Sequence, residues 1–112
     1  AQYCAANAGV VGLTRAVAKE LGQFGIRVNT ICPDAVLEGS SLWADDDYRL
    51  GTAKRYGISE EEIPDYYKER CALKTNIQPE DIANAALFLV SNQAAKITGA
   101  IITVDGGVAF VR

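Results

Sequence analysis

Two short apolar runs restrict the fold of this chain more than any other feature of its sequence. Residues 26–32 (IRVNTIC) and 100–104 (AIITV) are rich in β-branched side chains, which favour strands. Helical patterns separate them, and strands separated by helices are typical of a parallel α/β sheet. A sheet of two strands leaves faces and edges uncovered. We therefore expect an incomplete folding unit that needs more polypeptide, or a partner, on the open edge of residues 26–32.

The first helical pattern covers residues 4–23. Its expected core face consists of apolar residues at spacings of three and four, namely Ala6, Val10, Leu13, Val17 and Leu21. A second stripe contains only small residues, namely Ala5, Gly9, Gly12 and Ala16. Each glycine costs a helix up to about 1 kcal/mol relative to alanine, so this stripe indicates close packing of another backbone.

Three further helices follow from their end signals. The acidic residues 45–47 can cap a helix at about 47–56, after a loop-like stretch at 39–41. Ser59 and Glu62 form a capping-box pattern that predicts a helix over 59–71. Pro79 fits the first position of a last helix, with Ile82, Ala86 and Leu89 on its buried face.

Composition excludes several classes of function. The 112 residues contain no histidine, so this chain alone cannot build a histidine–zinc site, a Ser-His-Asp triad or a Cys-His pair, and no metal site is expected. The net charge of −3 argues against binding to nucleic acid or an anionic membrane. The three separated cysteines, Cys4, Cys32 and Cys71, are typical of small apolar residues in a reducing cytoplasm, where we expect the protein to reside.

Tyr3 and Asn7 lie one helical turn apart, so they project from one face at the start of the first helix. Tyr3 can be a buried aromatic cap with a satisfied hydroxyl, or a general acid or base. The positive end of the helix dipole favours a phenolate at this position. The spacing alone leaves both interpretations open.

Many short motifs in one order resemble the short-chain dehydrogenase/reductases. They cover residues 3–107 and comprise Tyr3–Gly9, Gly12–Arg15, Glu20–Leu21, Gly25–Asn29, Pro33, Pro79–Ala83, Phe88–Ser91, Thr98–Gly99 and Val104–Gly107. The resemblance implies a Rossmann-type doubly wound parallel sheet that transfers hydride to or from NAD or NADP. It also implies that the chain is the C-terminal half of one such domain. The glycine-rich phosphate turn, the assisting serine and most of the cofactor site would lie in the N-terminal half.

The resemblance assigns the catalytic acid/base to Tyr3. Asn7 occupies the position of the family's lysine, which holds the ribose hydroxyls of the cofactor and supplies a charge that favours the tyrosinate. An asparagine can hydrogen-bond a hydroxyl but carries no charge. Activity of the parent protein is therefore in question, and we expect the isolated chain to be inactive and to bind NAD or NADP weakly.

Pro33, Asp34 and Val36 match the family's Pro-Gly-x-Val segment beside the nicotinamide, and this implies a cofactor-binding role for them. Asp34 stands where the family has glycine, and a simple turn residue after proline is the alternative. Asp105, at the end of the second strand, is expected to be structural.

A narrower resemblance concerns residues 29–43 and 53–58, together with Tyr66 and Tyr67. These resemble the dehydrogenase domain of bifunctional rhamnulose-1-phosphate aldolase/alcohol dehydrogenases, and imply oxidation or reduction of lactaldehyde in rhamnose catabolism. Residues 37–72 would then form a substrate lid, with Trp43 and Tyr48 in its wall. A surface helical hairpin that packs these aromatic residues is the alternative.

Three functions remain open. The chain can belong to an NAD(P)-dependent dehydrogenase of a small alcohol or aldehyde. It can be a structural module that has lost its chemistry, since the helix at 4–23 typically packs against its copy in a homo-oligomer of this family. A free-standing binding protein is disfavoured because too much sheet edge would stay uncovered.

Overall fold

The computed structural model describes residues 1–110 and divides the chain into two compact units. The first comprises Ala1–Cys32 and Ala83–Thr103, and the second comprises Pro33–Ile82 and the residues from Val104 onward. Strands β1 (Thr30–Pro33) and β2 (Ile101–Val104) form a two-stranded sheet. The Thr30 N–H donates to the Ala100 carbonyl at 2.9 Å, and the Asp34 N–H donates to the Val104 carbonyl at 3.4 Å. This register is parallel, as predicted.

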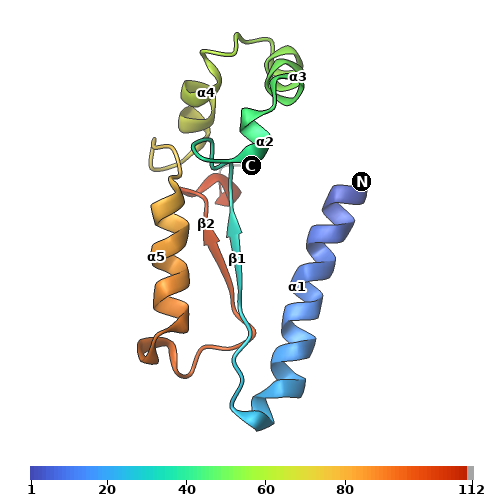
Figure 1. Cartoon of the computed structure of the whole chain (residues 1–112), viewed down its shortest axis with the longest axis vertical. Coiled ribbons are helices and arrows are strands. Elements are labelled where there is room, and N and C mark those ends of the chain that lie inside the picture. The colour runs from blue at the N-terminus through green and yellow to red at the C-terminus, as the bar shows by residue number, and fades with distance from the viewer. Residues whose placement is uncertain (111–112) are drawn as a thin grey trace. The chain divides into compact units, whose positions relative to one another are not determined.

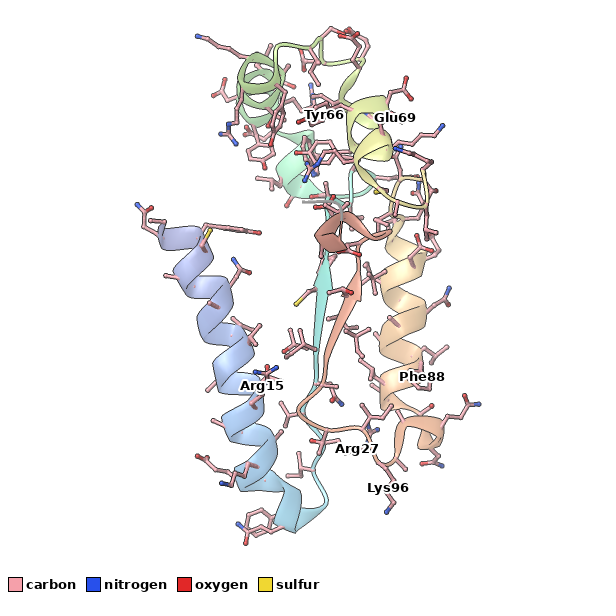
Figure 2. The ribbon with its side chains drawn as sticks, turned by 180° about the vertical axis from the view of Figure 1, so that it is seen from behind. Arg15, Arg27, Tyr66, Glu69, Phe88 and Lys96 are labelled. Atoms are coloured by element: carbon pink, nitrogen blue, oxygen red, sulfur yellow. The ribbon has the colours of Figure 1, made fainter. Side chains whose placement is uncertain are left out.

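Helices lie on both sides of the sheet in the first unit. Helix α1 (Gln2–Leu21) lies on one side and α5 (Pro79–Val90) on the other (Figure 1). Short 3-10 turns, η1 (Gly22–Phe24) and η2 (Asn92–Ala94), follow the two helices. Arg27, which precedes β1, contacts the residues on either side of η2. Its guanidinium donates to the carbonyls of Ile97 and Ser91 at 3.3 and 3.4 Å (Figure 2).

The apolar face predicted for α1 is covered only in part, since Val17 and Leu21 are half-buried but its other residues are exposed. Thr14 and Ala18 are the buried residues, whereas Leu13 is 63% exposed and Val10 is also exposed. The hydroxyl of Thr14 hydrogen-bonds the hydroxyl of Thr30, and Ala18 faces Gly99. Periodicity locates an apolar stripe, but the contacts with the sheet select a face one residue further along.

The predicted strand at 26–32 begins four residues late. Asn29 explains the difference, because its side chain makes the bonds that a ladder would make. Its amide N–H donates to the Ile97 carbonyl at 3.0 Å, and its amide oxygen accepts from the Ala100 N–H at 3.0 Å. Regular pairing therefore begins at Thr30, and it ends at Pro33 as predicted.

The second unit includes helices α2 (Ser41–Ala44), α3 (Asp46–Tyr56) and α4 (Ile63–Arg70) and the first turn of α5, and the 3-10 turn η3 (Val108–Phe110) follows later in the sequence. Asp45 caps α3 by accepting from the Tyr48 N–H at 2.8 Å, which confirms that the acidic residues start this helix. Helix α2 was not predicted, because it has only four residues and begins within the loop-like pair Ser40 and Ser41.

Helix α4 begins later than the predicted residue 59. Only half of the expected capping box forms, since the Ser59 N–H donates to the Glu62 carboxylate at 2.8 Å without starting the helix. A helix that began at Ser59 would place Pro64 in its second turn, where the ring meets a carbonyl one turn earlier. Starting at Ile63 places Pro64 in the first turn, where proline is tolerated.

Helix α5 begins at Pro79 as predicted, with Glu80 and Asp81 in its first turn. The Asp81 carboxylate accepts from the Gln78 N–H at 2.8 Å and so closes the start of the helix. Leu89 is buried, and Ile82 and Ala86 are half-buried, on the face predicted to be inward. None of the helices within residues 1–110 combines the length and apolar character required to cross a membrane.

Replacement of Gly107 by alanine is expected to destabilise the second unit. Gly107 has a φ of 86°, and a Cβ added there would lie 2.7 Å from the Cβ of Ala72. The left-handed backbone alone costs a non-glycine residue about 1–3 kcal/mol. Gly51→Ala is the control, since nothing described lies within 4 Å of its added methyl in α3 and alanine favours a helix. Urea unfolding of the full-length protein measures both, and equal midpoints for Gly107→Ala and the parent would contradict the expectation.

Candidate functional site

Tyr3 and Asn7 are neighbours on the exposed start of α1. Tyr3 is 80% exposed, so the interpretation of a buried aromatic cap is wrong. The side-chain amide of Asn7 donates to the backbone carbonyl of Tyr3 at 2.8 Å, across one helical turn. The first turn of α1 has no acidic residue and no side-chain cap, so no carboxylate there offsets the positive end of the helix dipole. The Tyr3 side chain at this end of α1 is accessible.

Pro33, Asp34 and Val36 form one extended segment that continues β1. The Asp34 N–H bonds to the last residue of β2, and Val36 forms a parallel bridge with Ile77. Asp34 lies between β1 and the Val36 bridge and not in a turn, so the turn-residue alternative is wrong. The Asp34 carboxylate lies 3.9 Å from the guanidinium of Arg70 on α4. The segment thus has a fixed backbone and places one acidic side chain beside one basic side chain.

The structural role predicted for Asp105 is confirmed. Its carboxylate accepts from the N–H groups of Gly107 and Ala109 at 2.9 and 3.0 Å. Both bonds hold the turn that follows β2, so this carboxylate is occupied by the backbone next to it.

Trp43 lies at the centre of the small core of residues 37–72. It is 9% exposed and forms the buried cluster with Ala53 and Ile63. Its ring makes edge-to-face contacts with Tyr48 and Tyr67, at centroid distances of 5.0 and 5.2 Å. The structure therefore brings the two predicted wall residues together within an aromatic cluster, as the helical-hairpin alternative expects. Their contact with a substrate stays a prediction.

Two titratable groups near this cluster are poor candidates for acid–base or nucleophilic chemistry. Burial, with a smaller contribution from Tyr56, raises the pKa of Tyr67 to about 12, although Arg70 opposes the shift. Burial also raises the pKa of the Cys71 thiol, and the nearby Asp34 adds to the effect. Both groups therefore stay protonated at neutral pH, and a protonated thiol is a weak nucleophile.

Sequence reasoning missed Arg70. Its guanidinium carbon lies 4.8 Å from the centre of the Tyr67 ring and 5.9 Å from that of Tyr66. Figure 2 shows Tyr66 on α4, and its ring stacks on Tyr56 of α3 at 4.5 Å. The signal was present in the sequence, because an aromatic residue and an arginine three residues apart share one helix face.

The predicted site residues fall into both units. Tyr3 and Asn7 belong to the first unit, and Pro33, Asp34, Val36, Trp43 and Tyr48 belong to the second. A separate recess of about 500 Å³ in the first unit is lined by Arg27, Asn29 and Leu89 among others, and by none of the predicted site residues. Cβ atoms added at Gly9 and Gly12 meet nothing described within 4 Å, so the close packing expected at the small-residue stripe does not occur within residues 1–110.

The elements described above form part of a Rossmann-type α/β fold, with a parallel sheet, helices on both sides and an exposed tyrosine near the start of a long helix. Comparison with known families agrees. The profile of a family described as Enoyl-(Acyl carrier protein) reductase matches residues 1–109. The chain belongs to the short-chain dehydrogenase/reductase family.

Two curated relatives illustrate the range of the similarity. The uncharacterized oxidoreductase YuxG of Bacillus subtilis (strain 168) is 48% identical over 112 residues, which are 98% of this chain and 16% of YuxG. The meso-2,3-butanediol dehydrogenase of Serratia marcescens is 39% identical over 108 residues, which are 96% of this chain and 37% of that enzyme. The chain thus spans well under half the length of either relative.

Two solved structures confirm the fold. Sorbitol-6-phosphate 2-dehydrogenase SrlD from Erwinia amylovora superposes with a TM-score of 0.85 and 35% identity, covering 95% of this chain and 40% of SrlD. An actinorhodin polyketide ketoreductase solved with NADPH gives a TM-score of 0.82 and 32% identity, covering 95% of this chain and 39% of the ketoreductase. The second of these similar proteins was thus solved with NADPH, and the predicted α/β fold fragment is confirmed.

Proposed function

We propose that the full-length protein is an NAD(P)-dependent dehydrogenase of a small alcohol or aldehyde, and that Tyr3 is its general acid or base. The observation that carries the proposal is the position of Tyr3, which is exposed at the positive end of α1 in a chain of this family. In alcohol oxidation the Tyr3 oxygen would take the hydroxyl proton, and in carbonyl reduction it would return that proton. NAD(P), when bound, would accept or donate the hydride.

Part of a cofactor site fits the residues present. Tyr3 and Asn7 are both exposed, and the bond from the Asn7 amide N–H to the Tyr3 carbonyl holds the Asn7 side chain in place. The Asn7 amide oxygen is then an acceptor for a ribose hydroxyl. Val36 and Asp34 have their backbone positions set by the bridge to Ile77 and the bond to Val104, so a nicotinamide carboxamide would meet an ordered segment.

The finer proposal is that the substrate is lactaldehyde and that the protein is a bifunctional rhamnulose-1-phosphate aldolase/alcohol dehydrogenase. Support comes from residues 29–43 and from the lengths of the relatives. The matched segment is 16% of YuxG but 37% of the Serratia dehydrogenase, so YuxG contains much more sequence than a dehydrogenase of that size. An upstream aldolase domain would supply the aldehyde in the same chain. Separate assays of rhamnulose-1-phosphate cleavage and of lactaldehyde-dependent NAD(P)H turnover test the two parts, and cleavage without turnover would remove the dehydrogenase.

A structural module without chemistry is the second candidate. Asn7 favours it, because no charge replaces the family's lysine at this position. The exposed apolar residues Val10 and Leu13 also favour it, because a second copy of α1 would cover them in a homo-oligomer. Such a module would retain the assembly and lose the hydride transfer.

Asn7→Lys separates the two candidates. In an active enzyme the added positive charge should stabilise the ionised form of Tyr3. In alcohol oxidation, where Tyr3 is the base, the pH at half-maximal kcat should therefore fall by about one unit, and the rate below that pH should rise about tenfold. Asn84→Lys, which adds the same charge at an exposed position of α5, should change neither. The measurement is kcat of the full-length protein between pH 6 and pH 10, roughly the range over which a tyrosine and its perturbed forms titrate. A parent and a variant that both fail to turn over would favour the structural module.

A further inference from the structure

Asp34 departs from the family's glycine, and the structure gives it a partner from another element. Its carboxylate lies 3.9 Å from Nη2 of Arg70, and the two side chains are only 21% and 22% exposed. Ion pairs that are largely withdrawn from water are screened less by salt than surface pairs. Glu69 and Lys74, by contrast, form an exposed pair at 3.2 Å on the same part of the chain.

Arg70 also contacts the aromatic cluster of residues 37–72. Its guanidinium carbon is 4.8 Å from the Tyr67 ring centre, and Tyr67 in turn packs edge-to-face on Trp43. A planar guanidinium can stack on an aromatic ring and face a carboxylate at the same time, which a lysine ammonium cannot do. Arg70 therefore connects the centre of the cluster with Asp34.

The segment around Asp34 has a second link to the same cluster. Ala35 and Leu37 pack against the core formed by Trp43 and its neighbours. Val36, between them, pairs with Ile77 instead. Alternate residues of one extended segment thus contact the cluster and the backbone ahead of α5, while Asp34 at its start faces Arg70.

We propose that Arg70 and Asp34 are positioning residues that hold residues 37–72 against the Pro33–Val36 segment and so set the affinity for the substrate. Neither side chain needs to touch the reacting atoms. The activity part of this inference rests on the proposed dehydrogenase function, since residues 33–36 border the nicotinamide only in such an enzyme. The packing part does not rest on it.

The test is a double-mutant cycle in the full-length protein with Asp34→Asn, Arg70→Met and the double variant. Each single variant should raise KM for the aldehyde about three- to tenfold, and Arg70→Met should change kcat and the affinity for NAD(P) by less than about twofold. The double variant should be no worse than Arg70→Met, because the pair is already broken. Arg70→Lys should restore little, since it keeps the charge and loses the stacking.

A second readout needs neither substrate nor cofactor. Amide hydrogen exchange in residues 37–72 should be faster in both single variants than in the parent. Glu69→Gln is the matched control, because Glu69 lies on α4 in an exposed pair and its loss should change neither exchange nor KM (Figure 2). Additive effects in the double variant, or unchanged exchange in residues 37–72, would overturn the inference. If the parent protein shows no turnover, the proposed function is refuted. The amide hydrogen exchange of residues 37–72 then tests the positioning role by itself.

Discussion

Tyr3→Phe is expected to lower kcat of the full-length protein by a factor of about 10²–10⁴, the usual contribution of general acid–base catalysis. The substitution removes only the hydroxyl that would exchange a proton with the substrate. Because phenylalanine keeps the ring and removes one hydroxyl, stability should change by less than about 1.5 kcal/mol. Steady-state turnover of NAD(P)H with a small aldehyde, together with thermal unfolding, measures the two quantities on one sample.

Tyr56→Phe is the control for this prediction. Tyr56 stacks on Tyr66 through its ring, which phenylalanine keeps, so its activity should match that of the parent. A Tyr3→Phe protein that retains most of its kcat would show that the proton travels through another group. The affinity for NAD(P) should stay close to that of the parent, since Asn7 and the Pro33–Val36 segment are unchanged.

Trp43→Ala is expected to cost about 3–5 kcal/mol of unfolding free energy, as other deletions of large buried aromatic side chains do. Trp43 is 9% exposed and contacts Tyr48 and Tyr67 edge-to-face, so its loss leaves a cavity at the centre of residues 37–72. Urea unfolding of the full-length protein, followed by exchange or near-UV signals from this region, is the measurement.

Leu42→Ala provides the comparison, since Leu42 is the neighbour of Trp43 in α2 but is 50% exposed. It should cost less than about 1 kcal/mol. The comparison also distinguishes a role of Trp43 in the stability of residues 37–72 from a role in contacting substrate. If Trp43→Ala left the unfolding midpoint unchanged and raised only KM, then the indole would serve mainly to contact substrate.

Elements with strong end signals were predictable from the sequence. Pro79 started α5 and the acidic residues before Tyr48 started α3, because both signals act within one helical turn. The start of α4 was not predictable, because the Ser59–Glu62 capping box favours a start at residue 59 whereas Pro64 is tolerated only in a first turn. The helix follows the proline and begins at Ile63. The start of β1 was not predictable either, because Asn29 uses its side chain in place of the backbone, and periodicity does not register that choice.

The sequence predicted those parts of the candidate site that depend on local spacing or on resemblance to the family, and not those that depend on tertiary contacts. Tyr3 and Asn7 share a face because four residues make one turn, and the structure keeps them so. The pairing of Asp34 with Arg70 joins residues 36 positions apart in the sequence, and no local rule relates them. The burial of Trp43 has the same origin, since α2, α3 and α4 must first assemble around it.

The side-chain bridge made by Asn29 limits which residues this position tolerates. The amide NH2 group of Asn29 donates to the Ile97 carbonyl, and its amide oxygen accepts from the Ala100 N–H. An aspartate of equal size would turn a second acceptor toward the Ile97 carbonyl, and a leucine would satisfy neither group. Exchange of this one amide for a carboxylate would therefore weaken the link to Ile97 and loosen the start of β1 without changing the length of any side chain.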